Sequence, residues 1–175
     1  ARGHPVIATT ETEEQATAVR AEAPELTVVN LYITSVYGSK SAGWDLDVLI
    51  NNAGAGQTGP MADVPIDRVR HLFEVNVFGT LAMTQAVLPA MAAKGAGRVI
   101  IVSSIAGVMS GPSFGPYSMT KHALEAMGKA MSAGLEGQGV DVQVLDPGPD
   151  RTGFNERRAA RVWGGGGEST GSAAG

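Results

Sequence analysis

Short apolar runs alternate along the chain with longer segments in which apolar residues recur at helical spacing. The short runs predict β-strands because turn-forming residues bound them: HPVIATT, ELTVVNLYI, LDVLINNAG, GRVIIVSS and VDVQVL. The run GRVIIVSS is too uniformly apolar for a strand with one wet face. We therefore expect it to be buried on both faces, as in a parallel sheet.

The segments between these runs predict helices. Residues 11–24 begin with acidic side chains and end at a proline, which is typical of an exposed helix. Residues 65–91 and 116–137 predict two more helices, and the first carries its apolar residues at Ile66, Val69, Leu72, Phe73, Leu81, Leu88 and Met91. Strands that alternate with helices predict an α/β fold: a doubly wound, Rossmann-like, mostly parallel sheet with helices on both faces.

Composition narrows the class of protein. The 175 residues suffice for one domain, which we place at residues 1–163, and the glycine- and serine-rich residues 164–175 predict a disordered tail. The net charge of -4 gives no reason to expect a nucleic-acid or membrane partner. The lack of cysteine and the scattered positions of the three histidines predict no metal site. We expect no apolar run to cross a bilayer, and no signal-peptide pattern opens the sequence, so we expect a cytoplasmic protein.

Polar clusters follow three of the predicted strands, at residues 51–54 (NNAG), 103–104 (SS) and 146–152 (DPGPDRT). In doubly wound sheets, ligands bind outside the carboxyl ends of the strands. Each cluster alone is equally well explained as a turn, a helix cap or the start of a loop. All three at one edge of a sheet favour a functional site.

Tyr117 and Lys121 lie four residues apart in a predicted helix and therefore share a face. The simpler interpretation is a tyrosine at the rim of the core beside a solvated lysine. The three polar clusters make an active site the better interpretation.

At these residues the sequence resembles the short-chain dehydrogenase/reductase family, from Pro5 to about Phe154. The matching motifs are NNAG after the third strand, the helix asparagine of NVFGT, a serine, and the Tyr-x-x-x-Lys of YSMTK. Tyr117 follows Ser104 by thirteen positions, the usual offset in the family, which favours Ser104 over Ser103.

The resemblance implies an NAD(P)-dependent oxidoreductase that interconverts a small alcohol and a ketone, with Asn76, Ser104, Tyr117 and Lys121 as catalytic residues. Tyr117 would be the general acid/base, and a nearby Lys121 ammonium should lower its pKa. The resemblance implies that Lys121 also holds the nicotinamide ribose, that Ser104 positions the substrate, and that Asn76 holds a water of a proton relay. A buried asparagine bonded to neighbouring main chain is the competing interpretation of Asn76.

The resemblance also implies cofactor contacts at Asn52, Ala53, Gly54, Tyr117, Lys121, Pro147, Gly148 and Thr152. It leaves NAD or NADP open, because Glu11 lies late for an acidic residue that selects NAD. Tyr32 also replaces the usual adenine-contacting aspartate of the family. Apolar residues near the site suggest an apolar substrate or ordinary loop packing: Met109, Pro112, Phe114 and Phe154.

Two family features have no match in the sequence: the glycine-rich turn of the Thr-Gly-x-x-x-Gly-x-Gly kind and the closing strand. We therefore expect a partial chain. An alternative function follows, a truncated or degenerate non-catalytic relative that does not bind the dinucleotide. Asp146 and Asp150 also stand where the family more often has uncharged residues.

The helices carry more apolar positions than one sheet-facing stripe needs, at Val77, Phe78, Val87, Met127 and Met131. This surplus predicts a helix face buried in a homodimer or homotetramer, as the resemblance also implies. A core that wraps more widely around the helices explains the pattern equally well.

Overall fold

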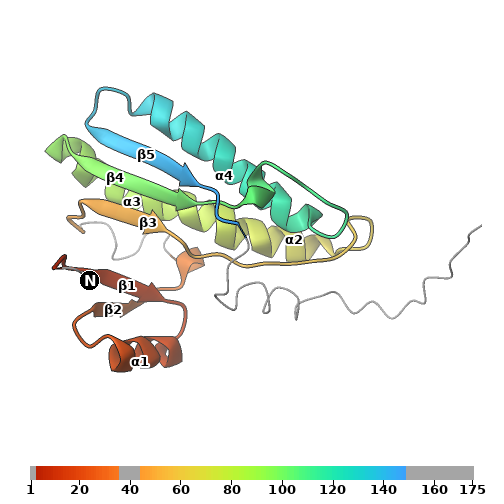
Figure 1. Cartoon of the computed structure of the whole chain (residues 1–175), viewed down its shortest axis with the longest axis horizontal. Coiled ribbons are helices and arrows are strands. Elements are labelled where there is room, and N and C mark those ends of the chain that lie inside the picture. The colour runs from red at the N-terminus through yellow and green to blue at the C-terminus, as the bar shows by residue number, and fades with distance from the viewer. Residues whose placement is uncertain (1–2, 36–43, 149–175) are drawn as a thin grey trace, which may run out of the picture.

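The computed structural model describes residues 3–35 and 44–148, which form two parallel sheets (Figure 1). The smaller sheet pairs β1 (Ile7–Thr10) with β2 (Thr27–Asn30). The larger has the order β3 (Val48–Asn51), β4 (Gly97–Val102), β5 (Val140–Leu145). Helices connect these parallel strands, so the predicted Rossmann-like α/β architecture is confirmed. Within the described residues, β1 and β3 are not hydrogen-bonded to each other.

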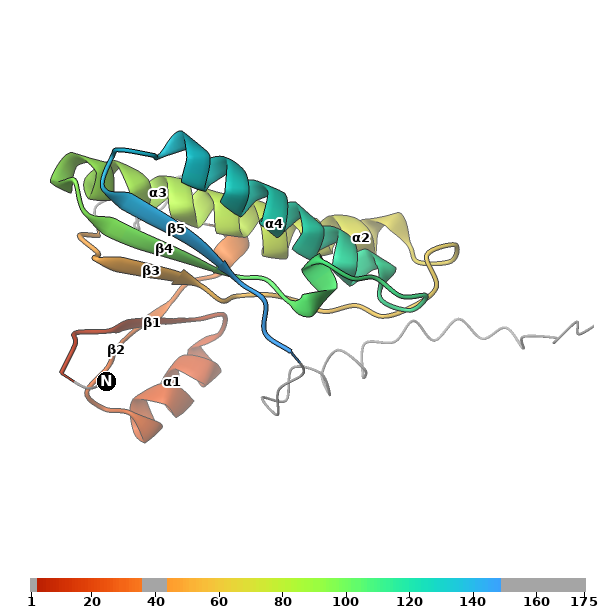
Figure 2. The same ribbon diagram turned by 45° about the horizontal axis from the view of Figure 1, so that its top comes forward.

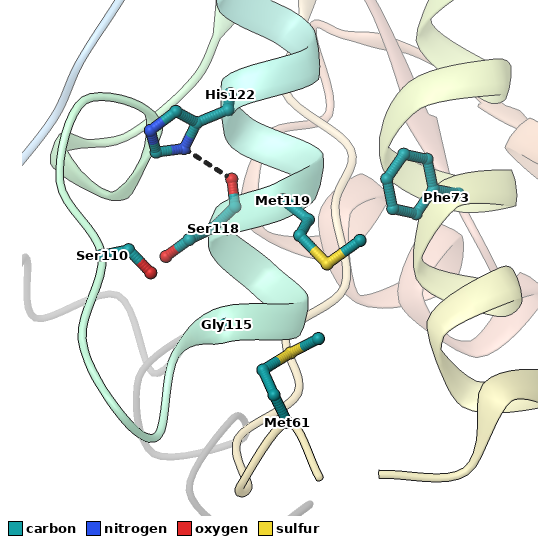
Figure 3. A pocket seen from close by; sticks show the side chains of 7 residues that line it. All are labelled: Met61, Phe73, Ser110, Gly115, Ser118, Met119 and His122. Atoms are coloured by element: carbon teal, nitrogen blue, oxygen red, sulfur yellow. Dashed lines mark hydrogen bonds between the residues drawn. The ribbon is translucent and has the colours of Figure 1, made fainter.

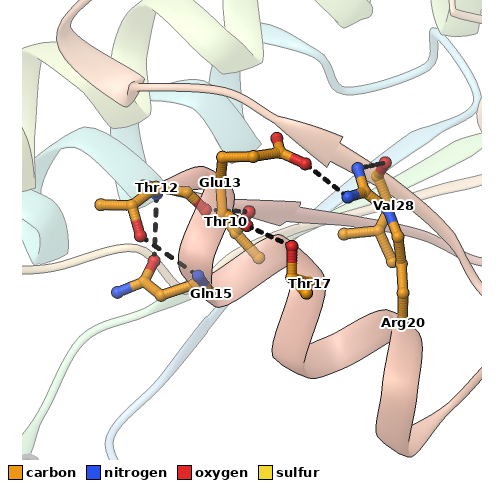
Figure 4. Close-up of polar contacts among 7 residues, drawn as sticks. All are labelled: Thr10, Thr12, Glu13, Gln15, Thr17, Arg20 and Val28. Atoms are coloured by element: carbon orange, nitrogen blue, oxygen red, sulfur yellow. Dashed lines mark hydrogen bonds and ion pairs between the residues drawn. The ribbon is translucent and has the colours of Figure 1, made fainter.

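The helix predicted after the first strand is α1 (Glu13–Glu22), and its first turn is stabilised by a cap. Thr12 Oγ1 accepts from Gln15 N at 3.2 Å while Gln15 Oε1 accepts from Thr12 N at 3.3 Å, which is a capping box (Figure 4). Arg20 pairs with Glu13 and donates to Val28 O, so the helix is fastened to β2. This unit packs α1 against β1 and β2, apart from the other helices (Figure 2).

The segment predicted as a helix at residues 65–91 is one continuous helical run with a defect inside it. It consists of α2 (Ile66–Phe73), the π-helical segment η2 (Glu74–Phe78) and α3 (Gly79–Lys94). By length and composition this run could cross a membrane, contrary to the expectation from the sequence, but half of its most apolar window is buried inside the protein. A buried core helix can have the same length and composition, so this run is not evidence for a membrane-spanning segment.

The helix that carries Tyr117 is α4 (Gly115–Gly134), and it lies close to β5. The close approach depends on Gly128, because a methyl group there would clash with the side chain of Val144. The short helix η1 (Ile33–Ser35) follows β2, and residues 36–43 lie outside the described part. Ile33 packs on Gly79 and so connects the smaller sheet to α3.

The core lies between the larger sheet and the helices α3 and α4, which cover the same face (Figure 2). Its fully buried apolar side chains include Val87, Met91, Val99 and Ile101. On the other face Ile50 is 60% exposed and Ile100 is half-buried, so the described residues cover only one face of GRVIIVSS. The expected burial on both faces is absent here because all the described helices beside this sheet lie on one side.

The apolar surplus on the helices is mostly core. Val87 is fully buried, and Met127 and Met131 pack partly buried against the core cluster. Val77 is half-buried, whereas Phe78 remains 41% exposed. The wider core therefore explains Val87, Met127 and Met131, and Phe78 is the position that the core does not use.

Candidate active site

The carboxyl ends of β3, β4 and β5 bring the predicted polar clusters to one edge of the larger sheet. In register, Asn51 lies beside Ile101 and Val102 beside Leu145. Beyond the strands, Ser103 N donates to Leu145 O at 2.7 Å and Ile105 N donates to Pro147 O at 3.3 Å. The loops after β4 and β5 are therefore hydrogen-bonded to each other, and the serines and the Asp-Pro-Gly segment meet as expected.

Tyr117 and Lys121 share a face of α4, and both are only 5% exposed. Lys121 Nζ lies 5.5 Å from the centroid of the Tyr117 ring and donates to Val102 O at 2.8 Å, at the end of β4. A solvated lysine beside a rim tyrosine is thereby excluded. The four-residue spacing in the sequence thus corresponds to a Lys121 amine beside the Tyr117 ring, at the carboxyl edge of the sheet.

The environment of Lys121 acts on its charge. Burial lowers the pKa of the ammonium from 10.5 to about 8, while the carboxylates of Asp146 and Glu125 oppose that shift. Lys121 is therefore close to a balance between its charged and neutral forms near pH 8. Strongly perturbed lysines of this kind are typical of functional sites.

The two serines after β4 have different environments. Ser104 precedes the short helix η3 (Ile105–Gly107), and its Oγ accepts from Ala106 N at 3.2 Å. Ser103 is buried, and its Oγ lies 3.4 Å from Lys121 O, a long hydrogen bond. Ser104 is the more accessible hydroxyl, and its own hydrogen is not used by the bond to Ala106.

Asn76 lies in the π-helical segment η2 and is 1% exposed. Its Oδ1 accepts from Ala55 N, and its Nδ2 donates to Ala55 O and to Thr120 Oγ1. Thr120 Oγ1 in turn donates to Tyr117 O at 2.8 Å. Both amide N–H groups of Asn76 are thus used within the protein, as in the competing interpretation of this residue from the sequence.

The residues predicted to hold the cofactor line the same edge where they are described. Asn52, Ala53 and Gly54 are exposed directly after β3, and Pro147 and Gly148 are exposed after β5. This exposed backbone at the carboxyl edge of the sheet could hold one end of a nicotinamide cofactor. Thr152, together with Asp150 and Phe154, lies outside the described residues.

The N-terminal unit carries Glu11 and Tyr32, the two positions considered for the adenosine half of the cofactor. Glu11 lies in the capping turn after β1, where its N donates to Gln15 Oε1 at 3.0 Å. Tyr32 is 40% exposed after β2, and its carbonyl accepts from Ser35. Both lie at carboxyl ends of strands, as expected for a nucleotide-binding edge.

An apolar hollow of about 540 Å³ lies on another face of α4. Its lining includes Met61, Phe73, Met119 and His122 (Figure 3). Met119 and His122 are not on the helix face of Tyr117 and Lys121, so this hollow is not the place where the predicted chemistry would occur. Met109, Pro112 and Phe114, proposed from the sequence as substrate contacts, are exposed.

The structure adds residues that the sequence reading did not select. Thr120 lies inside the Tyr-x-x-x-Lys motif and joins Asn76 to α4. Glu125 lies one helical turn beyond Lys121, a spacing that could have indicated a contact. The π-helical geometry around Asn76 has no signal in the sequence, although such segments are frequent at functional sites.

Comparison with known proteins agrees with this geometry. The family model described as short chain dehydrogenase matches residues 1–162, and the chain belongs to that family. The NADPH-dependent 3-dehydrocapnine reductase of Ornithobacterium rhinotracheale is 44% identical over 124 residues, which are 69% of this chain and 42% of that protein. The chain therefore spans less than half the length of this relative.

Solved structures show the same fold. A short-chain dehydrogenase from Streptomyces avermitilis is similar with a TM-score of 0.77 and 32% identity, over 86% of this chain and 58% of that one. The closed form of serine dehydrogenase complexed with NADP+ is similar with a TM-score of 0.83 and 27% identity, over 91% of this chain and 68% of that one.

Proposed function

We propose that the protein is an NAD(P)-dependent oxidoreductase that interconverts an alcohol and a ketone, with Tyr117 as the general acid/base. The observation that carries the proposal is the buried pair on α4, in which Lys121 Nζ lies 5.5 Å from the Tyr117 ring centroid. A tyrosine alone is a poor base at neutral pH because its ordinary pKa is about 10. A neighbouring ammonium stabilises the phenolate and lowers that pKa.

Each residue has a distinct role in this proposal. When a ketone is reduced, the Tyr117 hydroxyl gives its proton to the substrate oxygen; when an alcohol is oxidised, the phenolate takes that proton. A bound nicotinamide supplies or accepts the hydride. Ser104 donates a hydrogen bond to the substrate oxygen and fixes it beside Tyr117, a positioning role. The free hydrogen of its hydroxyl supports this role.

The role of Asn76 in this proposal is mainly to hold the site together. Its amide already makes three hydrogen bonds within the protein, to Ala55 and Thr120. A relay water would have only the second lone pair of Oδ1. The main role that we propose for Asn76 is to position Ala55, and the water relay remains a further prediction.

The cofactor would lie along the carboxyl edge of both sheets. Lys121 and Tyr117 would contact the nicotinamide ribose, and the exposed backbone of Asn52, Ala53 and Gly54 would lie beside it. Pro147, Gly148 and Thr152 complete the proposed contacts. The names of the relatives, an NADPH-dependent reductase and a complex with NADP+, make NADP(H) the first cofactor to test, with NAD(H) beside it.

The non-catalytic alternative is favoured by one observation: among the described residues, no hydrogen bonds join β1 to β3, so the sheet edge that a dinucleotide would follow is interrupted.

A direct experiment separates the two functions. The full-length protein is incubated with NADPH or NADH deuterated at the transferable position and a panel of ketones, and the alcohols are analysed by mass spectrometry. Hydride transfer predicts one deuterium on the carbinol carbon. No deuterated alcohol, together with no nucleotide binding by calorimetry, would favour the non-catalytic relative.

A further inference from the structure

Glu125 is a partly buried carboxylate that the proposed reaction does not use. It lies on α4 four residues after Lys121, so the two side chains share a helix face. Its Oε1 is buried and, within the described part of the chain, accepts no hydrogen bond. A buried carboxylate oxygen without a partner is costly, so its presence calls for a physical reason.

The surroundings of this carboxylate connect it to the turn that carries Ser104. A methyl group on Gly107 would lie 2.6 Å from Ser103 Oγ and 3.1 Å from Glu125 Oε1. A side chain at residue 107 would overlap Ser103 Oγ and press on Glu125, so glycine lets the backbone of η3 pack closely on both. The side chain of Glu125 thus connects α4, the helix that carries Lys121, with the turn after Ser104.

Lys121 is buried one helical turn before Glu125, and the carboxylates of Asp146 and, to a smaller extent, Glu125 favour its charged form. The titratable groups that face Lys121 come from α4, namely Tyr117 and Glu125, and from the loop after β5, namely Asp146. In the described residues, β4 offers the Val102 carbonyl as a neutral acceptor for Nζ. Asp146 has the larger effect of the two on the Lys121 pKa but is exposed to solvent, whereas Glu125 is partly shielded and packs close to Gly107 of η3.

We propose that Glu125 is a positioning residue that keeps Lys121 in its charged form while it supports the turn that carries Ser104. The inference rests on the proposed function, since a charged Lys121 is what makes Tyr117 an effective acid/base. Removal of the Glu125 charge destabilises the Lys121 ammonium relative to the free amine. The Lys121 pKa, about 8 with Glu125 present, therefore falls in Glu125→Gln.

The test is an NMR titration of the lysine ε-carbons in the full-length protein without substrate. Glu125→Gln should lower the Lys121 pKa relative to wild type, and Glu125→Asp, which keeps the charge, should recover most of the wild-type value. Glu136→Gln is the matched control, because it removes an exposed carboxylate just beyond α4 and should leave Lys121 unchanged. Equal Lys121 titrations in wild type and Glu125→Gln, with a cooperative melt in both, would overturn the inference.

The pH profile of turnover separates this inference from the proposed function. In Glu125→Gln the alkaline limb of the profile should move to lower pH, because Lys121 loses its proton earlier; an unmoved limb would contradict the role of Glu125 in the reaction. If Tyr117→Phe kept wild-type turnover, the proposed function would fail even where the Lys121 titration in Glu125→Gln behaved as expected.

Discussion

Asn76 holds both polar groups of Ala55: Oδ1 accepts from Ala55 N at 2.7 Å, and Nδ2 donates to Ala55 O at 2.9 Å. The other N–H of the amide donates to Thr120 Oγ1 at 3.0 Å. A single side chain therefore fixes the loop after β3 to the helix that carries Tyr117 and Lys121. The position of the loop proposed to face the nucleotide and that of the helix that carries Tyr117 depend on the same residue.

Asn76→Ala should lower the free energy of unfolding by at least about 2 kcal/mol, since buried polar groups left unpaired cost roughly 1–3 kcal/mol each. Urea unfolding measures this change. Asn52→Ala is the control, because Asn52 is exposed in the same loop, and its effect should stay within about 0.5 kcal/mol. Equal effects of the two substitutions would show that the Asn76 hydrogen bonds do not stabilise the fold.

The same helix gives a test of close packing. Gly128→Ala should destabilise the protein by about 1–3 kcal/mol because its methyl group would overlap Val144 on β5. Gly134→Ala, at the end of the same helix with open space around it, should be neutral or slightly stabilising through helix propensity. Thermal melts of the two variants compare the effects directly, and a neutral Gly128→Ala would refute the close packing of α4 on β5.

The sequence predicted the elements whose periodicity was strong. The strand GRVIIVSS, the long helix from residue 65 and the helix around Tyr117 are all present. The four-residue separation of Tyr117 and Lys121 correctly predicted that they share a helix face, because helix geometry alone fixes that relationship. The meeting of NNAG, the serines and Asp-Pro-Gly followed from parallel strands with aligned carboxyl ends.

Other features could not be read from the sequence because they depend on tertiary contacts. Val87 and Met131 looked like surplus apolar positions, yet they contribute to a core that reaches around the helices. The π-helical turn at Asn76 coincides with hydrogen bonds from its side chain to Ala55, a distant partner that local propensity does not encode. The burial of Glu125 depends on the approach of Gly107, which is distant from it along the chain.

The pH dependence of stability follows from Lys121. Its pKa in the folded protein is about 8, against 10.5 for an ordinary lysine, so between these values the unfolded state binds more protons. Stability should therefore rise with pH through this window, and below pH 8 the buried charge destabilises the fold by about 3 kcal/mol. Lys121→Met should show a flatter dependence between pH 8 and 10.5 in urea unfolding. Parallel curves for wild type and variant would contradict the depressed pKa.

Assembly through the exposed helix face gives a further prediction. Phe78 is 41% exposed on the helical run, and we expect it to be covered in a homodimer or homotetramer. Phe78→Lys should shift the full-length protein toward monomer in light scattering. Met109→Lys, an exposed apolar position in the loop after η3, should leave the assembly unchanged. A wild-type protein that is monomeric at micromolar concentration would refute the association.

The acid/base role of Tyr117 is tested most directly by Tyr117→Phe in the full-length protein, with turnover and cofactor affinity measured on the same sample. Loss of the hydroxyl should reduce kcat by roughly 10²–10⁴-fold, the usual contribution of a positioned acid/base, while the cofactor Kd changes little. Lys121→Ala should instead weaken both turnover and cofactor binding, because it removes a charge and a ribose contact together. Wild-type turnover in Tyr117→Phe would contradict the assignment of Tyr117 as the group that moves the proton.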